Sequence, residues 1–350
     1  MTSAQMDDLQ YPYDRITLRA HSHHIDHILA PSQRRQPVWI LAGKEGIGKA
    51  TAAFYLAARL LSQQSDPLFG DDASAVIGDA SEATAALIRA GSHPDFKYIH
   101  ARGDTGSKAI STDQVREMSS FLAMTPSMSQ WRVVIIDALD DININGANAM
   151  LKTLEEPPKN SMILLISHAT GSILPTIRSR SRMLRMNTLD AEDARDIIAM
   201  LYPDIEPDWL AIMASIADGA PGRAVMMAET GCVDLYAESL TLFCQNTSDL
   251  LVVEHLASQW GLGGVRHRDR RHMAYVLFDR LLAKAVRAGQ ASVVGSSVAL
   301  EQSALDHIRQ RCTQIELAEY HHQFLSEWRE AEGLNLAMMP VMMRLLRALT

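Results

Sequence analysis

The sequence has few cysteines and no long apolar run. Its three cysteines, Cys232, Cys244 and Cys312, are far apart and form no CxxC pair, so neither a disulfide framework nor a cysteine-ligated zinc site is predicted. No segment approaches the roughly 18 uninterrupted apolar residues of a membrane span, and residues 1–10 lack the apolar core of a signal peptide. We therefore expect a cytoplasmic protein that has no membrane partner.

The sequence also lacks an excess of basic residues. Its 350 residues include 33 Lys and Arg against 41 Asp and Glu, a formal net charge of −8. This balance excludes a protein coated with cations for bulk binding of nucleic acid, so any contact with DNA is expected to be local. Apolar residues make up 47% of the chain, which is enough to fill the cores of two or three domains at this length.

Short apolar runs alternate with helical segments in the first half of the chain. The runs at 37–42, 133–136 and 163–166 predict strands buried on both faces of a parallel sheet, with a further strand near 96–99. Residues 49–61 and 146–154 have helical periodicity. This alternation predicts a doubly wound α/β domain over residues 1–187.

The pattern from residue 190 onward is helical, with breaks at 203, 207, 219–222 and 231. We predict a small helical domain over residues 188–232 and an all-helical domain over residues 233–350. The segment 61–90 is rich in Ser, Asp and Ala and contains no cysteine. It is interpreted as an insertion between the first helix of the α/β domain and the next strand.

A phosphate-loop motif follows the first predicted strand. Gly43, Gly46, Gly48 and Lys49 fit the GxxxxGK pattern, in which glycines let backbone N–H groups surround a phosphate and the lysine adds a positive charge. The motif normally continues with Ser or Thr, whose hydroxyl binds Mg²⁺, but this chain has Ala50. Thr51 carries a hydroxyl about 100° further around the helix. The motif predicts a nucleotide site with weakened metal binding.

A second departure occurs at the end of the strand at 133–136. Asp137 occupies the position of a magnesium-binding acid, but the glutamate that normally follows and activates water is replaced by Ala138. Asp140 and Asp141 lie further along and are interpreted as turn or cap residues. The strand at 163–166 is followed by Ser167 and His168, where a polar side chain either senses phosphate or has no role.

Together these motifs and two further segments resemble the AAA+ subunits of bacterial DNA clamp loaders. The two segments are the run NAMLKTLEEPP at 148–158 and Ser179-Arg180-Ser181. The missing residues at Ala50 and Ala138 make the likeness closer to the delta-prime subunits of DNA polymerase III than to the ATPase subunits. The resemblance implies an AAA+ P-loop domain, a small helical lid domain and a C-terminal helical collar that joins subunits.

The resemblance also assigns a role to Arg180, which stands in the Ser-Arg-Cys motif of the family with Ser181 in place of the cysteine. It implies an arginine finger that acts in trans on ATP bound by a neighbouring subunit. The partners implied are tau/gamma ATPase and delta subunits in a hetero-pentameric ring, the sliding clamp and primer-template DNA. The chain would belong to the DNA polymerase III holoenzyme without its own ATPase or polymerase catalysis. No zinc and no required cofactor are implied, and ATP is a candidate ligand of the degenerate site.

Two alternative functions remain open from the residues. An active AAA+ ATPase of the tau/gamma type, which loads clamps or remodels DNA-bound proteins, would use Asp137 with Thr51 or Asp140 as improvised ligands. A nucleotide kinase would have no need of the long helical region or of the Arg180 segment.

Three residue clusters are assigned no function at this point. The histidines His21, His23, His24 and His27 are interpreted as part of a solvated helix, because no further metal ligands accompany them. The basic run at 266–272 could touch DNA phosphates, but an exposed helix start is the simpler reading. Arg223 is interpreted as part of a helix start.

Overall fold

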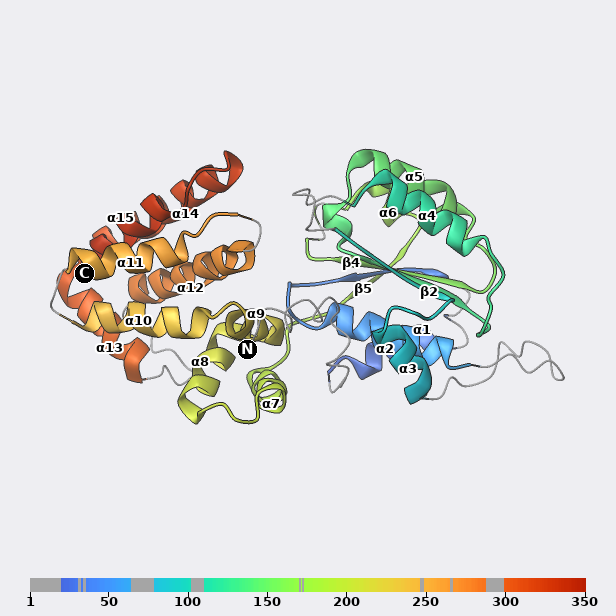
Figure 1. Cartoon of the computed structure of the whole chain (residues 1–350), viewed down its shortest axis with the longest axis horizontal. Helices are drawn as coiled ribbons and strands as arrows, with labels where there is room; N and C mark the ends of the chain where they lie inside the picture. The colour runs from blue at the N-terminus through green and yellow to red at the C-terminus, as the bar shows by residue number, and fades with distance from the viewer. Residues whose placement is uncertain are drawn as a thin grey trace. The chain divides into compact units, whose positions relative to one another are not determined.

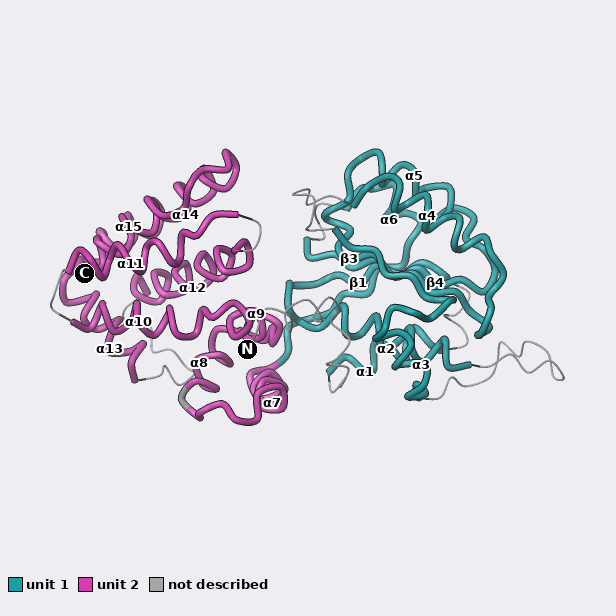
Figure 2. The backbone as a smooth tube through the Cα atoms, in the orientation of Figure 1, with its two compact units in different colours: residues 1–189 teal, residues 190–350 magenta. Residues whose placement is uncertain are grey.

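The computed structural model describes residues 20–30, 33, 36–63, 79–101, 110–169, 171, 173–245, 249–264, 267–287 and 299–350. The chain divides into two compact units, Met1–Leu189 and Asp190–Thr350 (Figure 2). Arg266 of the basic run and residues 64–78 of the 61–90 insertion lie outside the described residues.

Unit 1 is built on a five-stranded parallel sheet in the order β2-β3-β4-β1-β5. The strands are β1 (Val38–Ala42), β2 (Phe96–His100), β3 (Arg132–Asp137), β4 (Ser161–Ser167) and β5 (Arg182–Arg185). Strands β1, β3 and β4 are the predicted apolar runs, and they occupy the three central positions of the sheet. All residues of β1 and β4 are buried, as expected for strands covered on both faces.

Helices cover both faces of this sheet (Figure 1). One face carries α1 (Ser22–Leu29), α2 (Lys49–Leu61) and α3 (Glu82–Arg89), and the other carries α4 (Thr112–Leu122), α5 (Ile144–Glu155) and α6 (Pro175–Arg178). A 3₁₀ turn, Leu139–Asp141, joins β3 to the segment before α5. On the α4–α5 side, Val134 and Leu165 of the sheet pack with Met118 and Met150 of the helices. The predicted α/β fold class, a parallel sheet covered by helices on both faces, is confirmed.

Strand β5, helices α4 and α6 and the 3₁₀ turn of unit 1 were not predicted from the sequence. Strand β5 has the sequence RMLR, in which charged residues hide the strand character, and Arg182 and Arg185 are exposed at its ends. It forms because it pairs with β1, with Met183 opposite Ile40 and Leu184 opposite Leu41. Helix α4 begins with a capping box between Ser111 and Gln114.

All elements in the described part of unit 2 are helices, as predicted (Figure 1). They are α7 (Ala191–Leu201), α8 (Pro207–Ala217), α9 (Pro221–Glu229), α10 (Cys232–Cys244), α11 (Leu250–Trp260), α12 (Arg268–Val286), α13 (Ala299–Arg311), α14 (Gln314–Gly333) and α15 (Met339–Leu349). One apolar cluster runs through the unit, from Ile198 to Leu349. The predicted boundary after residue 187 lies two residues from the limit of unit 1, and the predicted boundary after residue 232 stays a prediction.

The apolar content of these helices is not concentrated enough for a bilayer. Among the residues that the structure describes, no helix combines the length and the apolar character that crossing a membrane requires.

Candidate functional site

The phosphate loop lies between the carboxyl end of β1 and the start of α2. Gly43 tolerates no side chain, because a Cβ atom there would lie 2.3 Å from the carbonyl oxygen of Met186. Gly46 and Gly48 have φ angles of 81° and 93°, in the left-handed region that glycine adopts without strain. The three glycines of the motif are therefore required by the backbone path itself.

The N-terminus of α2 is available to an anion. Gly48 is the N-cap residue and no side chain caps the helix, so its first N–H groups point out of the helix without intrahelical partners. Backbone N–H groups and the helix dipole at this position attract phosphate. The residues of the loop therefore fit a phosphate group.

Lys49 is held inside the loop. Its side chain is 3% exposed, and Nζ donates hydrogen bonds to the carbonyl oxygens of Gly43 at 2.8 Å and Lys44 at 2.7 Å. Burial lowers the pKa of Lys49 to about 8, although the carboxylates of Asp137, Glu45 and Asp140 act in the opposite direction. Two of the three N–H donors of the ammonium group are thus engaged by carbonyl oxygens of the loop.

The positions that would hold Mg²⁺ fit poorly. Ala50 has no hydroxyl, and Thr51 is a half-buried residue further along the first turn of α2. Asp137 ends β3, and its Oδ2 accepts a hydrogen bond of 3.0 Å from the Tyr98 hydroxyl. Burial raises the pKa of Asp137, opposed by the Tyr98 hydrogen bond and by His168, Lys49 and His100. Tyr98 thus engages one of the two carboxylate oxygens that a magnesium ion would use.

Asp140 does not replace the missing acid. Its Oδ1 accepts a hydrogen bond from the Ser167 hydroxyl at 3.1 Å, and its Oδ2 accepts one from the backbone N–H of His168 at 2.6 Å. Both carboxylate oxygens thus join the turn after β3 to the end of β4. The sequence interpretation of Asp140 as a turn residue agrees with these contacts, and Ser167, buried at the strand end, is engaged by Asp140.

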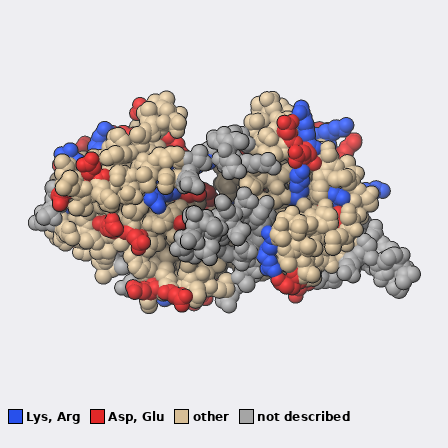
Figure 3. Space-filling model, viewed as in Figure 1, with Lys and Arg blue, Asp and Glu red and all other residues tan. Residues whose placement is uncertain are grey.

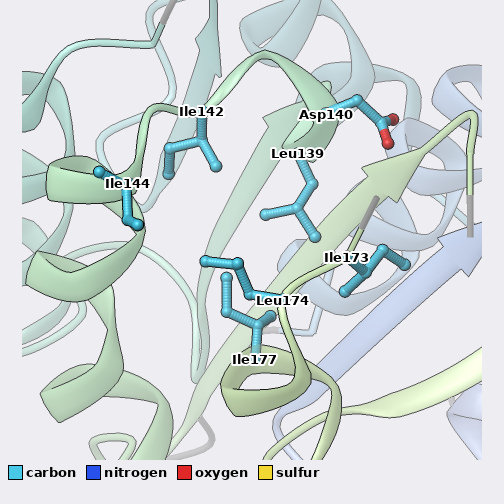
Figure 4. A pocket seen from close by; sticks show the side chains of 7 residues that line it. All are labelled: Leu139, Asp140, Ile142, Ile144, Ile173, Leu174 and Ile177. Carbon is cyan, nitrogen blue, oxygen red and sulfur yellow. The ribbon is translucent and has the colours of Figure 1, made fainter. Parts of the chain in front are cut away.

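A cavity of about 220 Å³ adjoins Asp140 (Figure 4). Its walls are otherwise apolar, and among them Ile144 at the start of α5 is 66% exposed. The described residues that line it are Leu139, Asp140, Ile142, Ile144, Ile173, Leu174 and Ile177. A lining of this composition offers a carboxylate and no cation, so it does not extend the phosphate site.

Sequence reasoning missed His21, which the structure places against the phosphate loop. His21 is 7% exposed, and its Nε2 donates a hydrogen bond of 3.0 Å to the carbonyl oxygen of Ile47. Burial lowers the pKa of His21 below 6.5, and His23 and Lys49 lower it further against the effect of the Ile47 hydrogen bond. The remaining histidines of the cluster lie on α1, where His23 and His27 are exposed as predicted.

The contact of His21 with the loop is expected to weaken in acid. Because the pKa of the docked histidine lies below that of a free one, the undocked form binds more protons, so docking is lost as pH falls below 6.5. We expect faster amide hydrogen exchange at Gly46–Lys49, corrected for intrinsic rates, as pH is lowered from about 7.5 to 5.5.

The variant His21→Gln supplies a donor that does not titrate, so its exchange should depend less on pH. Some dependence should remain, because burial also lowers the pKa of His24. Ser22→Ala, an exposed neighbour, serves as the control. Equal pH dependence in the wild type and His21→Gln would contradict this role.

Arg180 lies near the amino-terminal ends of β1 and β5, whereas the phosphate loop follows the carboxyl-terminal end of β1. It borders a cavity of about 540 Å³ together with Gln36, Pro37 and Val38, which lead into the amino end of β1. The loop starts after the carboxyl end of the same strand, and the path from Pro37 to Gly43 spans about 20 Å of extended chain. The structure therefore does not bring Arg180 together with Gly43, Lys49 or Asp137.

The Arg180 guanidinium is held by groups of its own chain. Its Nε donates a hydrogen bond of 2.9 Å to Glu155 Oε1, and Nη2 donates to the same oxygen. Nη1 donates to the Thr176 carbonyl oxygen at 2.9 Å and to the Ser179 hydroxyl at 3.2 Å. Ser181, which replaces the family's cysteine, donates a hydrogen bond from its hydroxyl to the Ile177 carbonyl oxygen.

The basic run near residue 270 is partly used inside unit 2. Arg270 donates to the Thr230 carbonyl oxygen at the end of α9, and Arg271 donates to the carbonyl oxygens of Leu262 and Gly264. On the face shown in Figure 3, Lys and Arg side chains are interspersed with Asp and Glu. Arg270 and Arg271 of this run therefore serve the fold. Arg223 lies in the first turn of α9 as predicted.

Metal ligands do not gather in the described part of the chain, where no group of three or more His, Cys, Asp or Glu side chains is arranged to hold an ion.

The family model and the curated relatives that match this sequence are subunits of DNA polymerase III. Residues 21–190 match the family model described as DNA polymerase III, delta subunit. The delta-prime subunit of DNA polymerase III from Pseudomonas aeruginosa is 30% identical over 223 residues, which cover 63% of this chain and 65% of the relative.

Two further curated relatives are the delta-prime subunit from Bacillus subtilis and the gamma subunit from Buchnera aphidicola. The first is 27% identical over 59% of this chain and 57% of the relative, and the second is 26% identical over 61% and 55%. The matches to these three curated relatives thus span 55 to 65% of their lengths. Among solved structures, a gamma-subunit-related protein from Thermotoga maritima has a TM-score of 0.47 and 18% identity, covering 94% of this chain and 98% of that one.

Proposed function

This chain belongs to the family of clamp-loader subunits of DNA polymerase III, and from that membership we propose that it acts as the delta-prime subunit. In this proposal it holds no hydrolytic centre of its own. It supplies Arg180 in trans to ATP on a neighbouring tau/gamma subunit and thereby helps to load the sliding clamp onto primer-template DNA during replication. The delta subunit completes the proposed hetero-pentameric ring.

The position of Arg180 carries the proposal. The Arg180 guanidinium lies near the amino-terminal end of β1, so it does not reach a phosphate at the chain's own loop, which follows the carboxyl-terminal end of that strand. A phosphate that this residue contacts must therefore come from another molecule, and in this proposal it belongs to ATP on the neighbouring subunit. An arginine delivered in this way stabilises charge that develops on the γ-phosphate and makes hydrolysis depend on assembly.

The composition of the chain's own phosphate loop supports the proposal that this chain has no hydrolytic centre. The glycines and the α2 N-terminus suit a phosphate, and ATP is the candidate ligand. Ala50 and Ala138 replace the metal-binding hydroxyl and the water-activating acid, while Asp140 is engaged by Ser167 and His168. We propose that the loop binds nucleotide weakly, if at all, and does not hydrolyse it.

The isolated chain is expected to turn over ATP no faster than a buffer blank, with or without Mg²⁺. The reason is that Ala50 and Ala138 leave the loop without the metal-binding hydroxyl and the water-activating carboxylate that hydrolysis uses. The measurement is steady-state phosphate release by the purified chain, with Lys49→Ala as the matched variant. Turnover that Lys49→Ala abolishes would identify an active ATPase of the tau/gamma type instead.

A further inference from the structure

Arg180 has little hydrogen-bonding capacity left in the arrangement observed. A guanidinium carries five N–H groups. Among the described residues, Glu155 accepts from Nε and Nη2, while Thr176 and Ser179 accept from Nη1, so four of the five are engaged. Firm recognition of phosphate by arginine uses two parallel N–H groups. The arginine must therefore release at least one present partner before it can bind phosphate in this way.

We propose that Glu155 is a positioning residue that keeps Arg180 retracted until ATP of the neighbouring subunit displaces it. This inference rests on the proposed trans-acting role of Arg180. Glu155 ends α5 and Arg180 precedes β5, so their ion pair joins the last turn of that helix to the entry of the edge strand. A triphosphate carries more negative charge than one carboxylate and replaces Glu155 as the partner of the arginine.

The exposure of the pair makes such an exchange feasible. The side chains of Arg180 and Glu155 are 32% and 50% exposed, and an exposed ion pair shifts an equilibrium by no more than about five-fold. The cavity beside the guanidinium is lined by Pro37, Leu154 and Pro157, and it leaves room for the arginine to change rotamer without moving the core. The ion pair is thus strong enough to favour the retracted position of Arg180 and weak enough for ATP to displace Glu155.

The test uses the reconstituted ring with Glu155→Gln in this subunit. Glutamine keeps the shape of the side chain and removes its charge. We expect turnover at the one ATP site that Arg180 serves, without DNA and at subsaturating ATP, to rise about two- to five-fold and the KM of that site for ATP to fall, because more of Arg180 is free to bind phosphate. The total rate of the ring should rise by the share of that site. Glu155→Asp retains the charge and should stay near the wild-type rate. Glu156→Gln removes the same charge from the adjacent exposed residue and is the matched control.

The double variant Glu155→Gln/Arg180→Ala should equal Arg180→Ala alone, because Glu155 acts only through the arginine. An unchanged or lowered rate in Glu155→Gln, or a rise that persists without Arg180, would overturn the inference. The single variant Arg180→Ala distinguishes a failure of the proposed function from a failure of the role of Glu155. If it lowers ATPase activity while Glu155→Gln behaves as wild type, the proposed function stands and only the retracting role of Glu155 fails.

Discussion

A ring that carries Arg180→Ala in this subunit is expected to lose turnover at one ATP site by about 10³-fold or more, the range measured for arginine fingers. The loss arises because the variant removes the guanidinium that, in the proposed function, stabilises charge on the γ-phosphate. Total DNA-stimulated ATPase should fall by the share of that site, and clamp loading should fall with it. The measurements are phosphate release and clamp loading on primed DNA by the reconstituted complex.

The fold and the assembly should survive this change. Arg180 is partly exposed, and its partners Glu155, Thr176 and Ser179 all reach solvent, so truncation leaves no buried charge. Arg180→Lys keeps the charge but loses the planar fork, and it should recover only part of the activity. Arg178→Ala, an exposed arginine in the same segment, serves as the control. A ring that assembles with Arg180→Ala and hydrolyses ATP at the wild-type rate would remove the trans-acting role.

The central strands and the phosphate loop could be predicted because their signals are local. Strands β1, β3 and β4 are continuous apolar runs, and a run buried on both faces needs no knowledge of its neighbours. The glycines of the loop likewise indicate a backbone conformation, with positive φ or a close approach of other atoms, that residues with a side chain rarely adopt. The edge strand β5 escaped prediction because its two apolar residues stand between two arginines and form a strand only beside β1.

The contacts that shape the site could not be predicted, because they join residues far apart in sequence. His21 bonds to Ile47 across 26 positions, and Arg180 meets Glu155 across 25. A histidine cluster without further metal ligands and a glutamate within a helical run carry no sign of these partners. Sequence pattern indicates which residues line a sheet edge, whereas side-chain pairing depends on the packing of whole elements.

Asp95 shows the same limit in the interior of unit 1. It follows a proline just before β2, in a position that suggests a turn, yet its side chain is fully buried. Its Oδ1 accepts from the Ser127 N–H at 2.7 Å, and its Oδ2 accepts from the N–H groups of Met128 at 2.7 Å and Ser129 at 3.0 Å. The buried guanidinium of Arg132 lies 3.5 Å from the same carboxylate.

Asp95→Ala is expected to reduce the free energy of unfolding of unit 1 by about 3–5 kcal/mol, the usual result of removing one partner of a buried ion pair. Three backbone N–H groups would lose their acceptor and Arg132 its counter-charge. The change is a large fraction of the roughly 5–15 kcal/mol that stabilises a domain. Urea unfolding, followed with amide exchange of peptides that contain residues 127–132, measures it. Asp113→Ala, which breaks an exposed ion pair with Arg116, should change stability by less than about 1 kcal/mol.

The pH dependence of the stability difference between wild type and Asp95→Ala tests separately whether the charge of Asp95 causes it. Burial acts to raise the pKa of Asp95, but the N–H groups of Met128, Ser127 and Ser129, together with Arg132, lower it below its ordinary value of 3.8. A carboxylate whose folded-state pKa is depressed stabilises the fold above the unfolded pKa, and this contribution is lost as pH falls through the folded value. The stability gap between wild type and Asp95→Ala should therefore stay constant from about pH 7 to 5 and narrow below about pH 4. A gap that is small at pH 7, or that widens in acid, would show that the charge of Asp95 does not hold this turn.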